Sequence, residues 1–156
     1  MAVIALCQFD LTRCFGYPYT KDKGASLGAP LIDHLVGTYE NPPRSTVAQA
    51  YDFIIETLEE AVTLMSEEKN NGRMNKYAAR ALLARVYLYH NDNRKAFDMA
   101  EQLIKDVDAS GSYALYPHEK YVAAWSVEAK FGSESFFEMA NSVDDTPGRD
   151  SWGYLL

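Results

Sequence analysis

The sequence predicts a mostly α-helical protein built from antiparallel helix pairs, and three observations favour this fold class. Residues 75–107 have the apolar spacing of two amphipathic helices joined by a very short turn. A second apolar stripe at helical spacing runs over residues 47–65. Small residues recur where two helix backbones would approach closely, namely Ala78, Ala81, Ala84, Ala96 and Ala100. A compact helical hairpin of this kind is typical of binding proteins, so we expect binding rather than catalysis.

The composition is that of one globular domain. The chain has 156 residues, 47% of them hydrophobic and 24% charged, which is enough for one core. The formal net charge of -7 argues against a nucleic-acid partner, because such binding needs clustered Lys and Arg. There is no run of about 18 apolar residues, so no transmembrane helix is predicted. The aromatic content of 13% is high and suits either an aromatic-rich core or a ligand surface.

The first element is a predicted helix over residues 2–15 that ends at Gly16, with much of its surface covered. Its apolar positions are Val3, Leu6, Cys7, Phe9, Leu11 and Cys14. The two cysteines lie about 10 Å apart along such a helix, which is too far for a disulfide, so we expect buried thiols. Residues 17–44 are rich in Gly and Pro without a sustained period, which predicts a long loop that packs on the core.

The starts of the next three helices carry capping signals. Thr46 and Gln49 have the spacing of a capping box ahead of the stripe over residues 47–65. Asn75 can cap the following helix through its side-chain oxygen, and Asp92 can cap the helix after that. Asn91 tolerates the left-handed conformation that ends many helices. These signals predict the boundaries of the helical pair over residues 75–107.

We expect one face of the helix after Asn75 to be buried, and two arginines lie within its turns. The predicted buried residues are Ala78, Ala81, Leu82, Ala84, Arg85, Val86 and Leu88. A guanidinium among apolar side chains must pair with a carboxylate or extend to solvent. We expect one of these arrangements for both Arg80 and Arg85. We expect Arg85 to pair with an acid such as Asp98 across the hairpin.

The chain after the helical pair is predicted to be rich in loops. We expect a helical core over about residues 1–110 and a loop-rich segment over about 111–156, within a single partial domain over 1–156. Residues 113–117 should be extended because Tyr116 precedes a proline. We predict a short helix over residues 119–129 and a short strand near the C-terminus over residues 134–140.

The helical pair resembles a tetratricopeptide pair in the spacing Leu83-Ala84-x-x-Tyr87 followed by Ala96, Ala100 and Leu103. The surrounding segments resemble the SusD/RagB family, in collinear order over nearly the whole chain. Two of them are Leu27-Gly-Ala-Pro-Leu31 and Glu134-Ser-Phe-Phe-Glu138. The others are residues 5–19, 43–47 with the helix that follows, 73–87 and 148–154. Both ends of the chain look cut, so we expect an internal fragment of a larger member of this family.

This resemblance implies a non-catalytic, surface-exposed lipoprotein of the bacterial outer membrane that binds glycans for polysaccharide utilisation. The implied partners are an oligosaccharide or other nutrient ligand and a TonB-dependent outer-membrane transporter, which receives the ligand. Neither Cys7 nor Cys14 corresponds to the lipidated cysteine of the family. The alternative function is that of a tetratricopeptide-type protein–protein interaction adaptor, which holds peptides in a helical groove.

Sugar recognition needs flat apolar faces for pyranose rings and planar polar groups for pairs of hydroxyls. The candidate ligand-binding residues are Trp125, Trp152, Tyr17, Tyr19, Tyr39, Arg149 and Asp150. The competing interpretation is structural. Trp125 and Tyr121, four residues apart, would then pack on the core. Trp152 would pack against the C-terminal half of the larger protein, and Tyr17, Tyr19 and Tyr39 would fill the core or its rim.

No residues with the spacing of a catalytic or metal site stand out. His34, His90 and His118 are scattered, with no partner at zinc-ligand spacing. There is no Gly-x-Ser-x-Gly and no Walker loop, and the acidic pair Glu59–Glu60 falls on a solvated helix face. The sequence therefore predicts a protein that is not an enzyme and needs neither a metal nor a cofactor.

Overall fold

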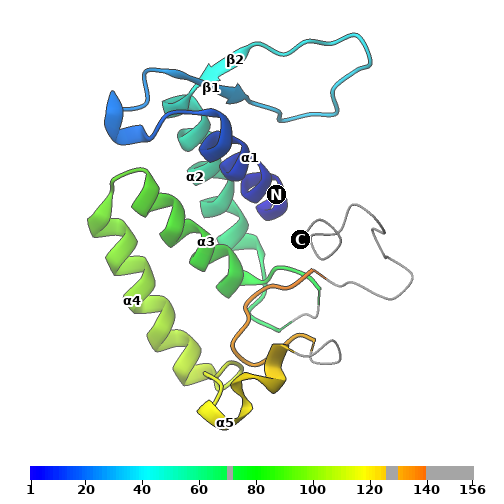
Figure 1. Ribbon diagram of the computed structural model, residues 1–156, viewed down its shortest axis with the longest axis vertical. Helices are drawn as coiled ribbons and strands as arrows, with labels where there is room; N and C mark the ends of the chain where they lie inside the picture. Colours follow the sequence, from blue (N-terminus) through cyan, green and yellow to red (C-terminus); the bar gives the residue numbers. More distant parts are fainter. Residues whose placement is uncertain (70–71, 126–129, 140–156) are drawn as a thin grey trace.

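The computed structural model describes residues 1–69, 72–125 and 130–139 and is mostly α-helical (Figure 1). Within these residues, four long helices form a row in chain order. They are α1 (Ala2–Phe15), α2 (Val47–Leu64), α3 (Lys76–Tyr89) and α4 (Asn93–Ser110). The helix α2 packs between α1 and α3, and α3 forms a tight antiparallel pair with α4. The predicted fold class is confirmed.

The predicted caps are present at the helix ends. Thr46 Oγ1 accepts a hydrogen bond from the backbone N–H of Gln49 at 3.2 Å, and Gln49 Oε1 accepts one from the Thr46 N–H at 2.9 Å. The side chains of Asn75 and Asp92 accept bonds from N–H groups in the first turns of α3 and α4, at 3.0 and 3.3 Å. Asn91, with φ of 69°, takes the left-handed conformation between these helices. Each prediction is confirmed because each cap is a local interaction.

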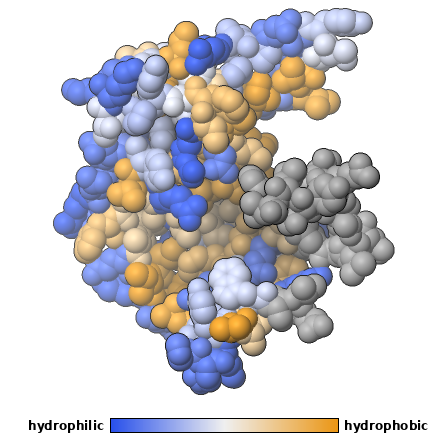
Figure 2. All heavy atoms as spheres, viewed as in Figure 1, coloured by the Kyte–Doolittle hydropathy of each residue, from blue (hydrophilic) through white to orange (hydrophobic). Residues whose placement is uncertain are grey.

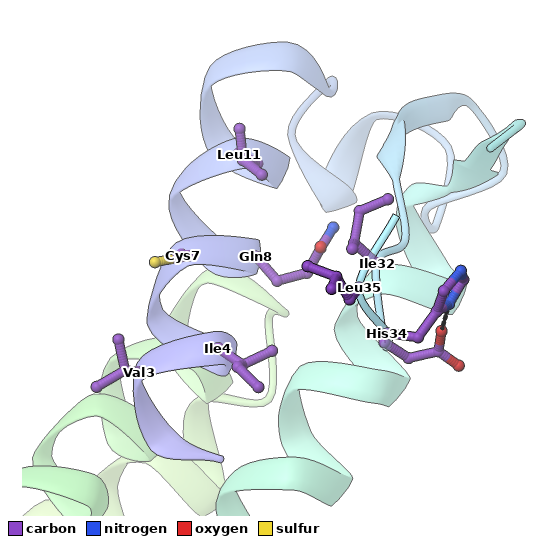
Figure 3. A pocket seen from close by; sticks show the side chains of 9 residues that line it. Val3, Ile4, Cys7, Gln8, Leu11, Ile32, His34 and Leu35 are labelled. Atoms are coloured by element: carbon purple, nitrogen blue, oxygen red, sulfur yellow. Dashed lines mark hydrogen bonds and ion pairs between the residues drawn. The ribbon is translucent and has the colours of Figure 1, made fainter. Parts of the chain in front are cut away.

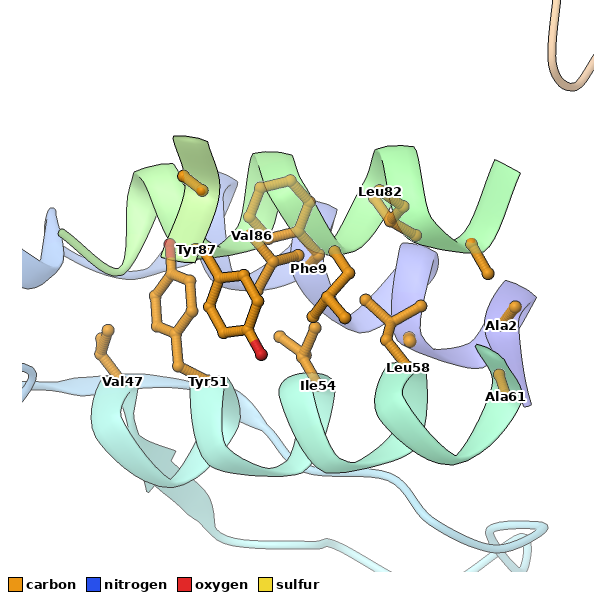
Figure 4. Close-up of a cluster of buried hydrophobic side chains, with 14 residues drawn as sticks. Ala2, Phe9, Val47, Tyr51, Ile54, Leu58, Ala61, Leu82, Val86 and Tyr87 are labelled. Atoms are coloured by element: carbon orange, nitrogen blue, oxygen red, sulfur yellow. The ribbon is translucent and has the colours of Figure 1, made fainter. Parts of the chain in front are cut away.

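The main core lies between α2 and its two neighbours (Figure 4). The helix α2 contributes Val47, Tyr51, Ile54, Leu58 and Ala61, α3 contributes Ala79, Leu82, Leu83, Val86 and Tyr87, α1 contributes Ala2, Ala5 and Phe9, and α4 contributes Ala96. Ala79 is fully buried, which lets the backbones of α2 and α3 approach closely. The predicted docking of the helical pair on the helix over residues 47–65 is therefore confirmed.

The buried face of α3 differs from the prediction. Leu83, which was not expected in the core, is only 1% exposed, whereas Leu88 is 57% exposed and Arg85 is exposed. The reason is that α3 lies between α2 and α4, so its buried arc is wide and follows residues 79, 82, 83, 86 and 87. The residues on the remaining narrow arc face solvent.

The ion pair across the α3–α4 hairpin also differs from the prediction. Arg80 Nη1 lies 2.6 Å from Asp106 Oδ2, and the Arg80 side chain is only 11% exposed. Asp98, the expected partner of Arg85, instead pairs with Arg94 one turn away on the same helix at 2.9 Å. The antiparallel packing brings the start of α3 beside the end of α4, which selects Arg80 as the arginine that crosses the hairpin.

We predict that the Arg80–Asp106 pair makes stability depend on acid pH. The hydrogen bond from Arg80, and then that from Gln102, lowers the pKa of Asp106 below its ordinary value of 3.8. A carboxyl with a lowered folded-state pKa adds stability above the unfolded-state pKa, and this is lost as pH falls through the folded-state pKa. Asp106→Asn should therefore lower the thermal unfolding midpoint at neutral pH, and the difference from the unmutated chain should shrink in strong acid.

Asp98→Asn is the matched control for this measurement, because the Arg94–Asp98 pair is exposed and lies within one helix. Exposed pairs contribute little, so its effect at neutral pH should be the smaller of the two. Equal midpoints for Asp106→Asn and the unmutated chain at neutral pH would contradict the prediction.

The region predicted to be a long loop contains the strands that the structure describes. It begins with one turn of 3-10 helix, η1 (Tyr19–Lys21). The strands β1 (Leu27–Pro30) and β2 (Arg44–Thr46) then pair antiparallel and close the loop over residues 31–43. Arg44 Nε strengthens this pair by donating to the Gly28 carbonyl at 2.7 Å. The short strand element therefore lies at residues 27–30 and 44–46. Residues 134–139, where the sequence predicted a strand, form an irregular loop instead.

The helix α1 buries one face only. Its buried residues are Ala2, Ala5, Gln8, Phe9 and Thr12. Cys7 and Cys14, which were expected to be buried thiols, are both free and exposed. They lie on the side of α1 that faces away from α2. Among the helices described, none is both long and apolar enough to cross a membrane.

Candidate functional site

A hollow of about 400 Å³ lies beyond the C-terminal end of α4, next to the short helix α5 (His118–Tyr121) (Figure 1). Its lining comes from two segments of the chain and consists of Tyr116, Tyr121, Ala124, Trp125, Glu134, Ser135 and Glu138. The hollow therefore combines three aromatic side chains with two carboxylates.

The aromatic wall of the hollow is positioned by a proline and two short helical turns. Tyr116 is extended ahead of Pro117, which precedes α5, and a 3-10 turn, η2 (Ala123–Trp125), follows. Tyr121 and Trp125 contact each other edge to face, with ring centroids 6.1 Å apart. They are 51% and 76% exposed, so they face the solvent instead of packing in the core. Two exposed rings side by side form an apolar surface open to a ligand.

The two carboxylates are held in place by backbone N–H groups. Glu138 accepts hydrogen bonds from the N–H groups of Phe131 at 2.8 Å and Gly132 at 3.2 Å. The bond from Phe131 is the main cause of the lowered pKa of Glu138, which is therefore ionised at neutral pH. Glu134 accepts a bond from the Tyr116 N–H at 3.3 Å. Both glutamates thus present fixed acceptors beside the aromatic wall.

The loop that carries these glutamates is anchored to the helices. Lys69 Nζ donates to the Gly132 carbonyl at 2.7 Å and lies 4.8 Å from the ring centroid of Tyr113. Phe136 packs against Tyr113 with centroids 4.9 Å apart. Tyr113 is buried in a second core cluster between α3 and α4. The glutamates are therefore fixed relative to the helical row.

This arrangement suits a neutral ligand that carries both apolar faces and hydroxyls. Aromatic rings can cover the C–H face of a pyranose, and carboxylate oxygens accept hydrogen bonds from its hydroxyls. Among the described residues there is no group of three or more His, Cys, Asp or Glu side chains that could hold a metal ion.

The structure places only one described candidate residue, Trp125, in this hollow. Tyr17, Tyr19 and Tyr39 lie near the opposite ends of the helices, around η1 and the loop between β1 and β2 (Figure 1). The structure does not bring them together with Trp125. The other candidates, Trp152, Arg149 and Asp150, lie outside the described residues.

The three tyrosines differ in their surroundings. Tyr19 is half-buried and packs against His90 with the two rings tilted by 48° and their centroids 4.2 Å apart. The ring of Tyr17 is covered by the Lys21 ammonium, 3.0 Å from its centroid. Tyr39 is 95% exposed. Tyr19 therefore contributes to packing, whereas Tyr39 remains open to solvent.

The residues that the sequence did not single out as a site are Tyr116, Tyr121, Glu134 and Glu138. One signal for the glutamates was available. In an extended segment residues 134, 136 and 138 share one face, so both acids could have been placed on the same side. Their position beside Trp125 depends on the folding back of the loop, which has no comparable sequence pattern.

The fold defines a class of protein: a mostly helical protein with a tetratricopeptide-like helix pair. Residues 2–88 match the SusD-like family described as "Starch-binding associating with outer membrane", and the chain belongs to this family. The resemblance to SusD/RagB proteins is thereby confirmed. No curated protein sequence matches the chain.

Solved structures of this family are closely similar to the chain. A SusD superfamily protein from Bacteroides vulgatus is 95% identical, with a TM-score of 0.92. A second B. vulgatus protein, named as sugar binding, is 44% identical with a TM-score of 0.87, and a SusD superfamily protein from Bacteroides thetaiotaomicron is 41% identical with a TM-score of 0.83. These matches cover 99%, 99% and 92% of this chain. The chain spans only 35%, 35% and 30% of those proteins.

Proposed function

We propose that this chain contributes a carbohydrate-binding surface to a non-catalytic nutrient-binding protein of the outer membrane. The observation that carries the proposal is the pairing of exposed Tyr121 and Trp125 with the fixed carboxylates of Glu134 and Glu138 in one hollow. The family description, starch binding in association with the outer membrane, supports the same ligand class and location.

In the proposed complex one sugar ring lies against Trp125 and Tyr121, and its hydroxyls donate to the glutamates. The oxygens of Glu134 and Glu138 accept three backbone hydrogen bonds in all, and Ser135 also bonds Glu138, which leaves lone pairs on the two carboxylates for ligand hydroxyls. Two carboxylates in the hollow and a net charge of -7 disfavour anionic sugars. The proposed ligand is therefore a neutral oligosaccharide.

We further propose that the bound oligosaccharide is passed to a TonB-dependent transporter, as the SusD/RagB resemblance implies. A site that delivers its ligand must release it, so modest affinity suits this role. The openness of the hollow and the 76% exposure of Trp125 are consistent with such a site. In this proposal the chain captures the ligand and performs no chemistry on it.

We predict that Trp125→Ala weakens oligosaccharide binding by at least about tenfold, which corresponds to about 1.4 kcal/mol. The reason is the loss of the larger of the two exposed ring faces. Isothermal titration calorimetry with maltooligosaccharides, together with a panel of other neutral glycans, measures the effect. Circular dichroism should show an unchanged helical signal, because the Trp125 side chain lies outside the core.

Tyr39→Ala is the matched control, because Tyr39 is an exposed aromatic residue in the loop between β1 and β2 and does not line the hollow. It should bind the same glycans as well as the unmutated chain does. Unchanged affinity in both Trp125→Ala and Tyr121→Ala, in a chain that binds a glycan, would move the site away from this hollow.

A further inference from the structure

A second hollow adjoins the proposed sugar site and has a different lining. Its volume is about 390 Å³, and it lies beside the last turns of α4. The apolar side chains that line it are Ile104, Val107, Tyr113, Leu115 and Phe136. This apolar hollow is open to solvent, because Ile104 and Leu115 are 61% and 80% exposed. In Figure 2, apolar side chains lie among charged ones over this lower part of the molecule.

The apolar hollow and the proposed sugar site meet at Glu134, which lines both of them. The lining changes on either side of this residue, since Ser133 belongs to the apolar hollow and Ser135 to the sugar site. The segment ahead of α5 divides in the same way, with Leu115 in the apolar hollow and Tyr116 in the sugar site. A ligand that occupies the sugar site can therefore extend into the apolar hollow.

Polar groups in the wall of the apolar hollow are already engaged within the protein. The Ala114 N–H donates to the Ser133 carbonyl at 3.0 Å. The Tyr113 hydroxyl accepts a hydrogen bond from Asn75 Nδ2 at 2.7 Å. A sugar ring buried here would lose hydrogen bonds to water and meet carbon atoms over most of the wall, which is unfavourable. A hydrocarbon group would instead gain free energy by leaving water.

The charges at the apolar hollow narrow the kind of group further. The carboxylates of Asp108 and Glu134 belong to its lining, and the chain has a net charge of -7. Both carboxylates would repel a group that carries a negative charge. The apolar hollow therefore suits an uncharged aliphatic or aromatic group.

A larger apolar hollow elsewhere in the chain lacks this continuity. It has a volume of about 450 Å³ and lies between α1 and the loop after β1, with Leu11 and Leu35 in its walls (Figure 3). His34 also lines it, and His34 Nδ1 lies 2.6 Å from Asp33 Oδ1. Among the described residues, it has no lining residue in common with the proposed sugar site. Position, and not apolar character alone, therefore singles out the hollow at Glu134.

We propose that the glycan bound by this chain carries an uncharged apolar substituent, an acyl or aryl group, and that the apolar hollow binds this group. The sugar ring to which the group is attached lies against Tyr121 and Trp125, so the inference rests on the proposed function and adds a substrate class to it. The continuity of the two hollows at Glu134 supports this occupant. The ligand class is thus a neutral glycan with apolar decoration.

The test compares methyl, phenyl and hexyl maltosides as ligands of the 156-residue chain by isothermal titration calorimetry. Methyl maltoside reaches only the sugar site, whereas the other two add an aromatic or an aliphatic group for the apolar hollow. Both should bind at least about tenfold tighter than methyl maltoside, because burial of each added carbon favours binding. The larger of the two gains distinguishes an aryl from an acyl substituent. Carboxyphenyl maltoside should bind no tighter than methyl maltoside, because its charge meets Asp108 and Glu134.

Leu115→Ser locates the gain in the apolar hollow. It should weaken the binding of hexyl maltoside at least about threefold and leave methyl maltoside unchanged. The fold should be retained, because Leu115 is 80% exposed. Leu88→Ser is the matched control, since Leu88 is 57% exposed on α3 and lines neither hollow. This variant should keep the full gain for hexyl maltoside.

Three outcomes would overturn the proposal. Equal affinities for methyl, phenyl and hexyl maltosides would remove the apolar subsite and leave the proposed sugar site in place. A gain for hexyl maltoside that persists in Leu115→Ser would show that the apolar group binds elsewhere. Absence of binding by all of these maltosides and by maltooligosaccharides would contradict the proposed sugar site and this inference together.

Discussion

Replacing Leu83 by alanine is expected to lower the free energy of unfolding by about 3 kcal/mol, within the range for large-to-small core substitutions. Leu83 is 1% exposed and packs in the main core with the residues of α2. Truncation removes buried apolar surface and leaves a cavity that the three surrounding helices cannot fully close. Urea unfolding followed by circular dichroism measures the change.

Leu88→Ala is the matched control, because it makes the same chemical change on the same helix at a residue that is 57% exposed. Its expected effect is below about 0.5 kcal/mol. The comparison tests the orientation of α3 directly, since the sequence placed Leu88, and not Leu83, on the buried face. A larger effect for Leu88→Ala than for Leu83→Ala would contradict the structure.

Asn75→Ala is expected to have a comparable effect, about 3 kcal/mol, through lost hydrogen bonds. Asn75 is 2% exposed, and its Oδ1 caps α3 by accepting from the Ala78 N–H at 3.0 Å. Its Nδ2 donates to the Tyr113 hydroxyl at 2.7 Å. Loss of the cap costs about 1 kcal/mol. Leaving the buried partner groups of Asn75 without their hydrogen bonds lowers the free energy of unfolding by about 1–3 kcal/mol more.

Two variants separate these contributions in the same unfolding experiment. Thr46→Ala removes an exposed cap and should cost only about 1 kcal/mol. Tyr113→Phe removes the hydroxyl to which Asn75 Nδ2 donates but keeps the cap, so it should fall between the unmutated chain and Asn75→Ala. Equal stability of Asn75→Ala and Thr46→Ala would show that the buried network around Tyr113 contributes nothing.

The helix boundaries could be predicted because their causes lie within a few residues. The capping box at Thr46, the cap at Asn75 and the left-handed Asn91 all involve groups at most four residues apart. Such interactions depend on local backbone geometry and form wherever the helix forms. The antiparallel α3–α4 pair follows from the same signals, since a short turn leaves no other arrangement for two long helices.

The burial of individual side chains could not be predicted so well. The sequence expected Cys7 and Leu11 to be covered and Leu83 not to be in the core, and the structure shows the reverse. Apolar spacing locates a stripe but does not say which neighbouring helix covers it. The surface of α3 is covered by two neighbouring helices, α2 and α4. In α1 only one of the two apolar faces is covered by a neighbouring helix.

The candidate site was predicted in part. Trp125 was selected for its ring, and the structure places it in the hollow. Glu134 and Glu138 reach the hollow because the N–H groups of Phe131 and Gly132 turn the loop around the Glu138 carboxylate. Contacts between Tyr116 and Glu134 span 18 residues, and no local pattern encodes them.

The sequence alone was sufficient to predict the helical fold class, the capped helix starts and the resemblance to SusD-like proteins. All three depend on short-range geometry or on the order of motifs along the chain. The packing of the helices decided which rings gather beside the glutamates, which arginine crosses the hairpin and which face of α1 stays open. These outcomes depend on contacts between residues far apart in the chain, whose energies exist only once the helices are side by side.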